Sequence, residues 1–220
     1  SDEEFLPSSE LHHGSKNYWL KQEHISKVIN ASFGSSTPDI LGLCEVENKA
    51  VVEDLADKLK KQKKLKVVHE ESLDQRGIDN AIIYDSQKLK LIAHGVKEVE
   101  LTGERPTRYI LWAHFKMKKN DRGITVFVNH WPSRYGGQEA SNWKRMTAAN
   151  ALSALIYELR QQYPNADEIA MGDFNDYPDN ESVKQIESCM FPESPCMKNA
   201  HEYLQGTGKG SHAYKGEWGM

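Results

Sequence analysis

The stretch "EIAMGDFNDYPDNESV" (residues 168–183) runs from apolar residues directly into a group of acids and amides. Short polar side chains of this kind let a chain leave a strand, because they hydrogen-bond their own backbone and tolerate unusual dihedral angles. Carboxylate and amide oxygens are also the ligands of hard metal ions. The stretch is therefore compatible with a turn that leads into a helix and with a metal site, and other parts of the chain must supply the deciding partners.

Strand and helix patterns alternate on both sides of this stretch. Apolar runs of strand length cover 39–46, 80–85, 88–101, 109–117, 124–131 and 168–174. Helical patterns cover 17–33, 49–64 and 140–162, and Asn48 is expected to cap the second. The expected apolar side of the first helix consists of Trp19, Ile25, Val28 and Ile29. Four strands follow one another in the middle of the chain, so the order favours an α/β or α+β layered sandwich over a doubly wound parallel sheet.

The composition fits a soluble globular chain that forms one domain. It has 220 residues, of which 38% are hydrophobic and 27% charged. The longest apolar runs reach only about eight residues, so none of them can span a bilayer. The net charge of -4 does not suggest the basic face of a tight nonspecific nucleic-acid binder. The basic run "KLKKQKKLK" (58–66) is expected to be a solvated helix end, with nucleic-acid binding as the alternative.

Three cysteines do not form a disulfide framework or a zinc-ligand pattern. Cys44 lies in an apolar run and is expected to be a buried small hydrophobe. Cys189 and Cys196 are spaced so that they could pair across a short loop in an oxidising compartment, or remain free.

Three strands deliver ionisable side chains at or next to their ends. These side chains are Glu45, His130 and Asp173, and Asn129 and Asn175 lie beside them in the sequence. If the three strand ends meet, they form an oxygen-rich pocket suited to Mg²⁺ or Mn²⁺. Each residue also has a structural interpretation. Glu45 could favour the following helix N-terminus, His130 could be a satisfied strand-end histidine, and Asp173 with Asn175 could form an Asx turn.

Arginines flank these strand ends. Arg105 and Arg108 precede one strand, and Arg134 lies in a glycine-containing loop. A guanidinium group clamps phosphate oxygens with two bonds, although a surface ion pair is the alternative for each. Arg76 and Asp79 lie in a loop that enters a strand, where they could form a structural pair.

Four segments in this order, "GLCEVEN", "RGIDNAIIY", "NHWPSR" and "MGDFND", resemble the endonuclease/exonuclease/phosphatase superfamily of DNase I-like proteins. The sequences of these segments are most similar to those of a bacterial branch of the superfamily. The resemblance implies an α+β fold with four layers, in which two mostly antiparallel sheets pack face to face with helices outside. It also implies divalent-metal-dependent hydrolysis of phosphoester bonds, as in a phosphodiesterase, nuclease or phosphatase, with Mg²⁺ or Mn²⁺ as the cofactor.

The resemblance implies a role for each candidate residue. Glu45 resembles the glutamate that binds the metal, and Asp173 resembles the aspartate that activates the attacking water. Asn175 resembles the amide that contacts the metal or a phosphoryl oxygen. His130 resembles the strand-end histidine that binds phosphate or assists protonation. The phosphate-binding candidates are Arg108, Arg134 and Asn129.

Two motifs of the superfamily are not present in the 220 residues. These are an initial "NxxNLF"-like strand and a final Ser-Asp-His motif. We therefore expect 1–220 to be a single domain that is incomplete at both ends. If these 220 residues were the whole natural product, we would expect poor folding and negligible turnover. A catalytically silent binding module is the alternative to an enzyme.

The substrate, the compartment and the partners are less defined. The acidic balance favours a small phosphoester slightly over duplex DNA, and export is expected only if a longer chain carries a signal peptide. Trp131, Tyr135 and residues 190–206 are candidates for lining the substrate pocket. No membrane span and no protein partner are predicted.

Overall fold

The structure, a computed structural model, describes residues 8–9, 14–34, 36–60, 64–188, 197–204, 207, 212–214 and 217–219. The described helices are α1 Ser15–Ser32, α2 Lys49–Lys58, α3 Gln138–Gln162 and α4 Glu181–Glu187, with a short 3₁₀ helix at Glu202–Leu204. The described strands are β1 Ile40–Val46, β2 Leu65–His69, β3 Asp79–Asp85, β4 Leu89–Lys97, β5 Ile110–Met117, β6 Gly123–His130, β7 Asp167–Asp173, β8 His212–Tyr214 and β9 Glu217–Gly219.

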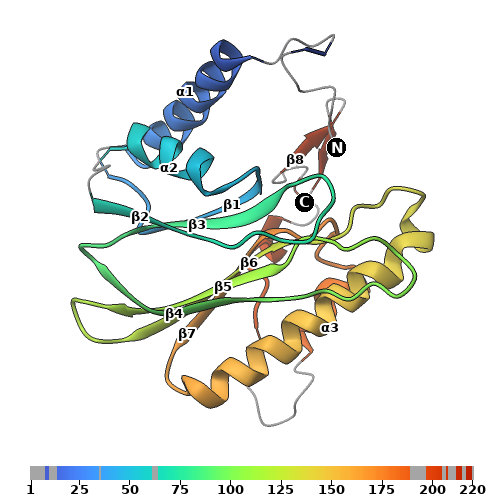
Figure 1. Cartoon of the computed structure of the whole chain (residues 1–220). Helices are drawn as coiled ribbons and strands as arrows, with labels where there is room; N and C mark the ends of the chain where they lie inside the picture. The colour runs from blue at the N-terminus through green and yellow to red at the C-terminus, as the bar shows by residue number, and fades with distance from the viewer. Residues whose placement is uncertain are drawn as a thin grey trace.

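Two sheets pack face to face and helices cover their outer sides (Figure 1). The smaller sheet has the order β1-β3-β2 and lies beneath α1 and α2, whereas the larger has the order β4-β5-β6-β7 and is covered by α3. Neighbouring strands are antiparallel except β6 and β7, which are parallel because α3 carries the chain back between them. The predicted four-layer α+β fold with two mostly antiparallel sheets is therefore confirmed.

Three apolar layers hold these four layers together. The smaller sheet packs on its helices through residues that include Val52, Leu55 and Ile83. Between the two sheets lie residues such as Ile82 and Phe115. The third apolar layer joins the larger sheet to α3. Alternate residues of β3 thus face opposite layers, as strand geometry requires.

Two predicted helices differ from those in the structure. The helix expected over 49–64 ends at Lys58, and 65–69 form the unpredicted strand β2, because the repeated lysines conceal the apolar alternation of a short strand. The Asn48 cap is confirmed, since its side chain accepts a hydrogen bond from Val51 N at 3.1 Å. No described helix is long and apolar enough to cross a membrane.

The expected apolar side of α1 is only partly buried. Trp19 and Val28 are 46% and 67% exposed, whereas Gln22 and Ser26 are buried. The reason is that α1 packs on α2 through polar contacts, such as the hydrogen bond from Gln22 Nε2 to Val51 O at 3.1 Å. Of the expected apolar side, Ile25 and Ile29 pack against the core beneath the helix, whereas Trp19 and Val28 remain exposed.

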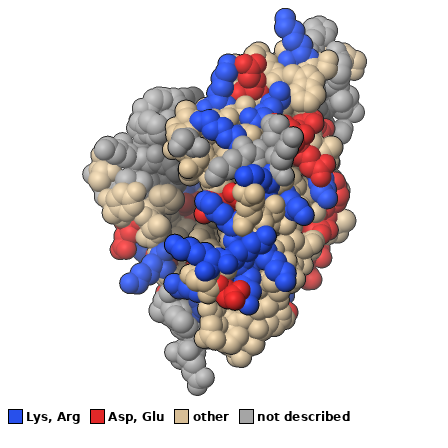
Figure 2. Space-filling view, turned by 90° about the vertical axis from the view of Figure 1, so that its left-hand side faces the viewer, with Lys and Arg blue, Asp and Glu red and all other residues tan. Residues whose placement is uncertain are grey.

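Lysine and arginine side chains gather at one end of the molecule, where β3 turns into β4 and β5 into β6 (Figure 2). Lys88 and Lys118 lie in these two turns, and Lys90 and Lys116 are paired in register. Strand β6 begins at this end and finishes with His130 at the other. The basic end is therefore remote from the predicted site. Cys189 and Cys196, which could pair or remain free, lie outside the described residues.

Gly172 allows β7 to lie close against β6. Its φ is 123°, and a Cβ added there would lie 2.0 Å from the carbonyl oxygen of Asn129. No side chain fits that space, so glycine is required immediately before Asp173.

We predict that Gly172→Ala lowers the free energy of unfolding by at least about 3 kcal/mol or prevents folding, because the new methyl group overlaps backbone. Gly103→Ala is the matched control, since Gly103 also has a positive φ, of 78°, but has no atom within 4 Å of its added Cβ. That variant should lose only about 1 kcal/mol from backbone strain. Urea unfolding measures both, and equal losses would contradict the assignment.

Candidate active site

Glu45 reaches the space at the ends of both sheets through an irregularity in β1. The register of β1 with β3 shifts between Leu43 and Val46, and Glu45 has a left-handed φ of 58°. Such a bulge redirects a side chain at the edge of a sheet. The Glu45 side chain is 64% exposed, and its Oε1 lies 3.9 Å from His130 Nε2. The smaller sheet thus delivers a carboxylate to a histidine of the larger one.

Asp173 and His130 end two neighbouring parallel strands in register. The chain remains paired just beyond them, because Trp131 N donates to Asp173 O at 2.9 Å. Cys44 ties the smaller sheet to the same place, since its Sγ donates to Asn129 O at 3.2 Å. The structure therefore brings together all three strand ends that the sequence marked.

His130 lies in an environment that disfavours its charge. Burial, followed by the nearby Arg108 guanidinium, lowers the pKa of His130 to about 4, although the Asp173 carboxylate acts in the opposite direction. Its buried Nδ1 has no hydrogen-bond partner in the described part of the chain. The imidazole is therefore neutral near pH 7, with one nitrogen able to donate and the other able to accept.

Asn175 shapes the turn that follows β7. Its φ is 51°, its N donates to Asp173 Oδ1 at 2.8 Å, and its Nδ2 donates to Trp131 O at 2.9 Å. This is an Asx turn, so the turn interpretation of the sequence is confirmed. Glu45 and Asn175 are two of the three non-glycine residues with positive φ in the described chain, and strained backbone of this kind clusters at functional sites.

Arg108 is buried behind the site. Its Nη1 lies 3.1 Å from Asp74 Oδ2, and its Nη2 donates to Trp131 O at 2.8 Å. The Trp131 carbonyl thus receives hydrogen bonds from both Arg108 and Asn175. The structure gives Arg108 a positioning role, and its predicted phosphate contact remains a prediction.

Arg134 also has protein partners. Its Nε donates to Asn175 O at 2.9 Å, and its Nη2 lies 3.2 Å from Asp176 Oδ1. The guanidinium carbon lies 4.1 Å from the centre of the Tyr177 ring. Because the side chain is 31% exposed, part of it stays open to solvent, and its predicted phosphate contact also remains untested.

Asn129 and Trp131 lie beneath the site rather than on its surface. Asn129 is 0% exposed, and its Oδ1 accepts a hydrogen bond from Trp131 Nε1 at 3.1 Å. Trp131 is 1% exposed and packs edge-on against Phe174. Of the residues proposed to line the pocket, Tyr135 is 94% exposed, whereas 190–196 and 205–206 lie outside the described residues.

Asp176 anchors the turn. In the sequence it stood out only as one member of a run of polar residues, so this role was missed. Its side chain is fully buried, and Oδ2 lies 2.8 Å from Nε of the equally buried Arg145 on α3. It also accepts hydrogen bonds from Gln138 and from Ser182 on α4. An arginine among the apolar residues of a helix was the signal that could have revealed this pair.

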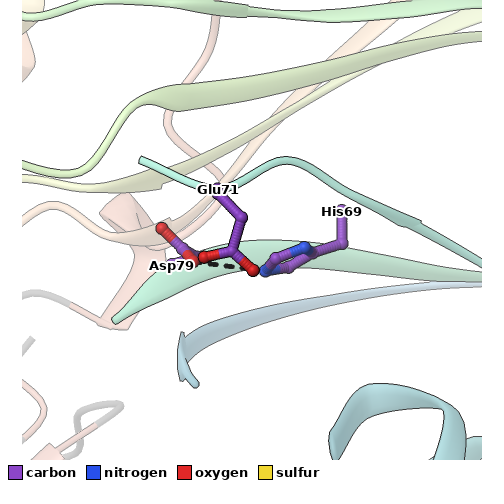
Figure 3. A group of neighbouring side chains, drawn as sticks. All are labelled: His69, Glu71 and Asp79. Carbon is purple, nitrogen blue, oxygen red and sulfur yellow. Dashed lines mark ion pairs between the residues drawn. The ribbon is translucent and has the colours of Figure 1, made fainter. Parts of the chain in front are cut away.

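A second group of ionisable residues lies in the smaller sheet. His69, Glu71 and Asp79 point toward one another (Figure 3). Their ligand atoms lie within 4.8 Å of one another, and no other group of three or more His, Cys, Asp or Glu residues in the described chain does so. The predicted ligand Glu45 is not part of this cluster.

The comparisons with known proteins agree with this architecture. A model of the endonuclease/exonuclease/phosphatase family matches residues 1–220. The chain belongs to this family. The family includes phosphoester hydrolases with several substrates, so membership gives a class of reaction and leaves the specific activity open.

Solved structures share the fold at low sequence identity. The human Nocturnin catalytic domain with bound sulfate is 16% identical, with a TM-score of 0.59 over 77% of this chain and 62% of that one. A mannosyl-6-phosphatase of Bacteroides thetaiotaomicron is 20% identical, with a TM-score of 0.61 over 80% of this chain and 66% of that one. A truncated TDP2 of Caenorhabditis elegans is 18% identical, with a TM-score of 0.56 over 77% of this chain and 60% of that one.

The match spans less than two thirds of the Nocturnin, mannosyl-6-phosphatase and TDP2 chains. No curated protein matches the sequence. Because the sequence identities to these solved structures are only 16%, 20% and 18%, the similarity establishes the fold alone.

We predict that Asp176→Asn lowers the free energy of unfolding by about 3 to 5 kcal/mol, because the buried Arg145 loses its counter-charge. Asp179→Asn, an exposed change of the same charge in the same turn, should stay within about 0.5 kcal/mol of the parent. Guanidinium unfolding monitored by tryptophan fluorescence measures both. A similar effect of the two variants would show that the ion pair does not hold the turn.

We also predict that acid destabilises the protein through His130. Its folded pKa of about 4 lies below the ordinary value of 6.5, so between these pH values the unfolded chain binds more protons. Stability should therefore fall as the pH decreases through this range, by up to about 3 kcal/mol from this group.

Urea unfolding at several pH values in EDTA tests the pH dependence. His130→Gln should flatten the pH profile, but only in part, because burial also lowers the pKa of His114. His24→Gln, at an exposed position of α1, is the control and should leave the slope unchanged. An unchanged slope in His130→Gln would refute the assignment.

Proposed function

We propose that the protein is a divalent-metal-dependent hydrolase of phosphoester bonds that acts by in-line attack of an activated water. The observation that carries this proposal is the meeting of Glu45 Oε1 and His130 Nε2 at 3.9 Å, with Asp173 in register beside His130. Membership in the endonuclease/exonuclease/phosphatase family supports the class of reaction.

The available donors fit Mg²⁺ or Mn²⁺. Glu45 and Asp173 offer exposed carboxylate oxygens and Asn175 offers an amide oxygen. Mg²⁺ keeps several waters and is commonly held by only one or two carboxylates, so a loose set of oxygens is sufficient. We assign Glu45 as the principal ligand. When bound, the ion would polarise a phosphoryl oxygen and neutralise its charge.

The chain's own residues perform the remaining steps. Asp173 uses one carboxylate oxygen to accept the Asn175 N–H, which fixes the orientation of the carboxylate and leaves the other oxygen to orient and deprotonate water. His130, neutral at pH 7, donates a hydrogen bond to a phosphoryl oxygen as charge accumulates there. Asn175 contributes its amide oxygen to the metal or its remaining N–H to the substrate.

We propose a small phosphoester as the substrate in preference to duplex nucleic acid. The basic end described above lies at the opposite end of β6 from His130, and the arginines near the catalytic residues, Arg108 and Arg134, are paired with Asp74 and Asp176. A mannosyl-6-phosphatase and a 2',3'-cyclic phosphatase are among the proteins with this fold. We further propose that residues 1–220 form a single domain.

The alternative function is a catalytically silent member of the family that binds a ligand without turnover. It is motivated by the first-strand and Ser-Asp-His motifs that the 220 residues do not contain. An active enzyme and a silent one differ in a single measurement, the release of product with added metal.

We predict that the protein, assayed with Mg²⁺ or Mn²⁺ against phosphomonoesters, phosphodiesters and oligonucleotides, releases product in an EDTA-sensitive reaction. Asp173→Asn should reduce kcat by about 100- to 10,000-fold, as expected for loss of a general base, with little change in melting temperature. Asp179→Asn is the matched control and should retain activity. Absence of metal-dependent turnover with every substrate would favour the silent member.

A further inference from the structure

His69, Glu71 and Asp79 converge from two strands and the loop between them (Figure 3). His69 ends β2, Asp79 begins β3, and Glu71 lies in the connecting loop. His69 Nε2 and Asp79 Oδ2 are 3.3 Å apart, and the ligand atoms of all three residues lie within 4.8 Å.

Two of these polar atoms are buried without a hydrogen bond. The side chains of His69 and Asp79 are 3% and 2% exposed, and neither His69 Nε2 nor Asp79 Oδ2 has a hydrogen-bond partner in the described chain. Their mutual contact counts as an ion pair only if the imidazole is protonated. Burying polar atoms without hydrogen-bond partners costs free energy of folding, and a bound ligand between these two atoms would offset that cost.

The cluster lies on the other side of the smaller sheet from the proposed active site. Asp79 has the same parity in β3 as Ala81, which packs toward the helices. Asn80 points the opposite way, and its Nδ2 donates to Val128 O in the larger sheet at 3.3 Å. Glu45 meets His130 of that larger sheet. Asp79 and its neighbour His69 therefore face the helices rather than the larger sheet that carries His130.

The ligand set matches a transition metal. Imidazole nitrogen and carboxylate oxygen are both ligand types that Zn²⁺ accepts, and three protein ligands leave a fourth position open. Bonds of about 2.0 to 2.2 Å in a tetrahedral arrangement place neighbouring ligand atoms about 3.3 to 3.5 Å apart, which the His69–Asp79 pair already satisfies. The exposed Glu71 lies at the outer side, where an ion and a water can enter.

We propose that His69, Glu71 and Asp79 form a second metal site that binds Zn²⁺, separate from the catalytic ion. The site fixes the loop between β2 and β3. Asp79 already accepts a hydrogen bond from Ser72 N at 2.8 Å through its other oxygen, and Asp74 in the same loop holds Arg108 at 3.1 Å. Arg108 in turn contacts the Trp131 carbonyl, so Zn²⁺ stiffens the support of the active site from behind.

The test uses the untagged chain stripped of metal and carrying Glu45→Gln and Asp173→Asn, which disable the proposed catalytic site. Calorimetric titration with ZnCl₂ should show one equivalent bound, and the melting temperature should rise with Zn²⁺ concentration. X-ray absorption should show one imidazole nitrogen with oxygen ligands and no sulfur.

The deciding comparison is Glu71→Gln against Glu70→Gln. Both positions are exposed, so neither change threatens the fold, but Glu70 contacts His94 at 3.3 Å rather than the cluster. Glu71→Gln should weaken Zn²⁺ binding at least about tenfold, the loss expected even from removing an outer-shell partner, whereas Glu70→Gln should leave it unchanged. His69→Gln should abolish binding if it folds. Absence of Zn²⁺ binding, or equal affinity in the two glutamate variants, would mean that His69 and Asp79 are only an ion pair.

Discussion

The close approach of β6 and β7 is the constraint on which the rest of the structure depends. Helix α3 returns the chain so that the two strands run parallel, and Gly172 lets their backbones meet where a methyl group would overlap Asn129 O. This contact fixes the register that sets His130 beside Asp173. With a different register, His130 and Asp173 would still lie on neighbouring strands, but their side chains would not lie side by side at the same end of the sheet.

The turn after β7 is held from outside the site. Asp176 is buried against Arg145, and through that pair the turn is fastened to α3. Asn175 is held from the other side, by the Trp131 carbonyl that Arg108 also contacts. The exposed residues proposed for chemistry thus rest on a buried polar layer whose members have few conformational alternatives. Such preorganisation is what an oxygen-rich metal site requires.

The apolar pattern predicted a layered α/β or α+β sandwich and strands that end near Glu45, His130 and Asp173, because periodicity and strand ends are local properties of the sequence. The four layers and the meeting of the three residues at one rim were implied by the resemblance to the family. The sequence could not predict that Glu45 would reach the site through a bulge, since a positive φ depends on the partner strand. Strand β2 was hidden because its lysines continue a basic helical pattern. The sequence could not show that Arg108 and Arg134 pair with Asp74 and Asp176, because such pairing depends on the tertiary structure and not on spacing.

The placement of charge also sets how the molecule would lie on a polyanion. The basic turns occupy one end of β6, and the proposed catalytic residues lie about 25 Å away at the other end of this eight-residue strand. A nucleic acid or an acidic surface that held the lysines would leave the catalytic rim facing bulk water. Attraction at the basic end would then tether the protein with its active site accessible, rather than hold the attracting polymer as substrate.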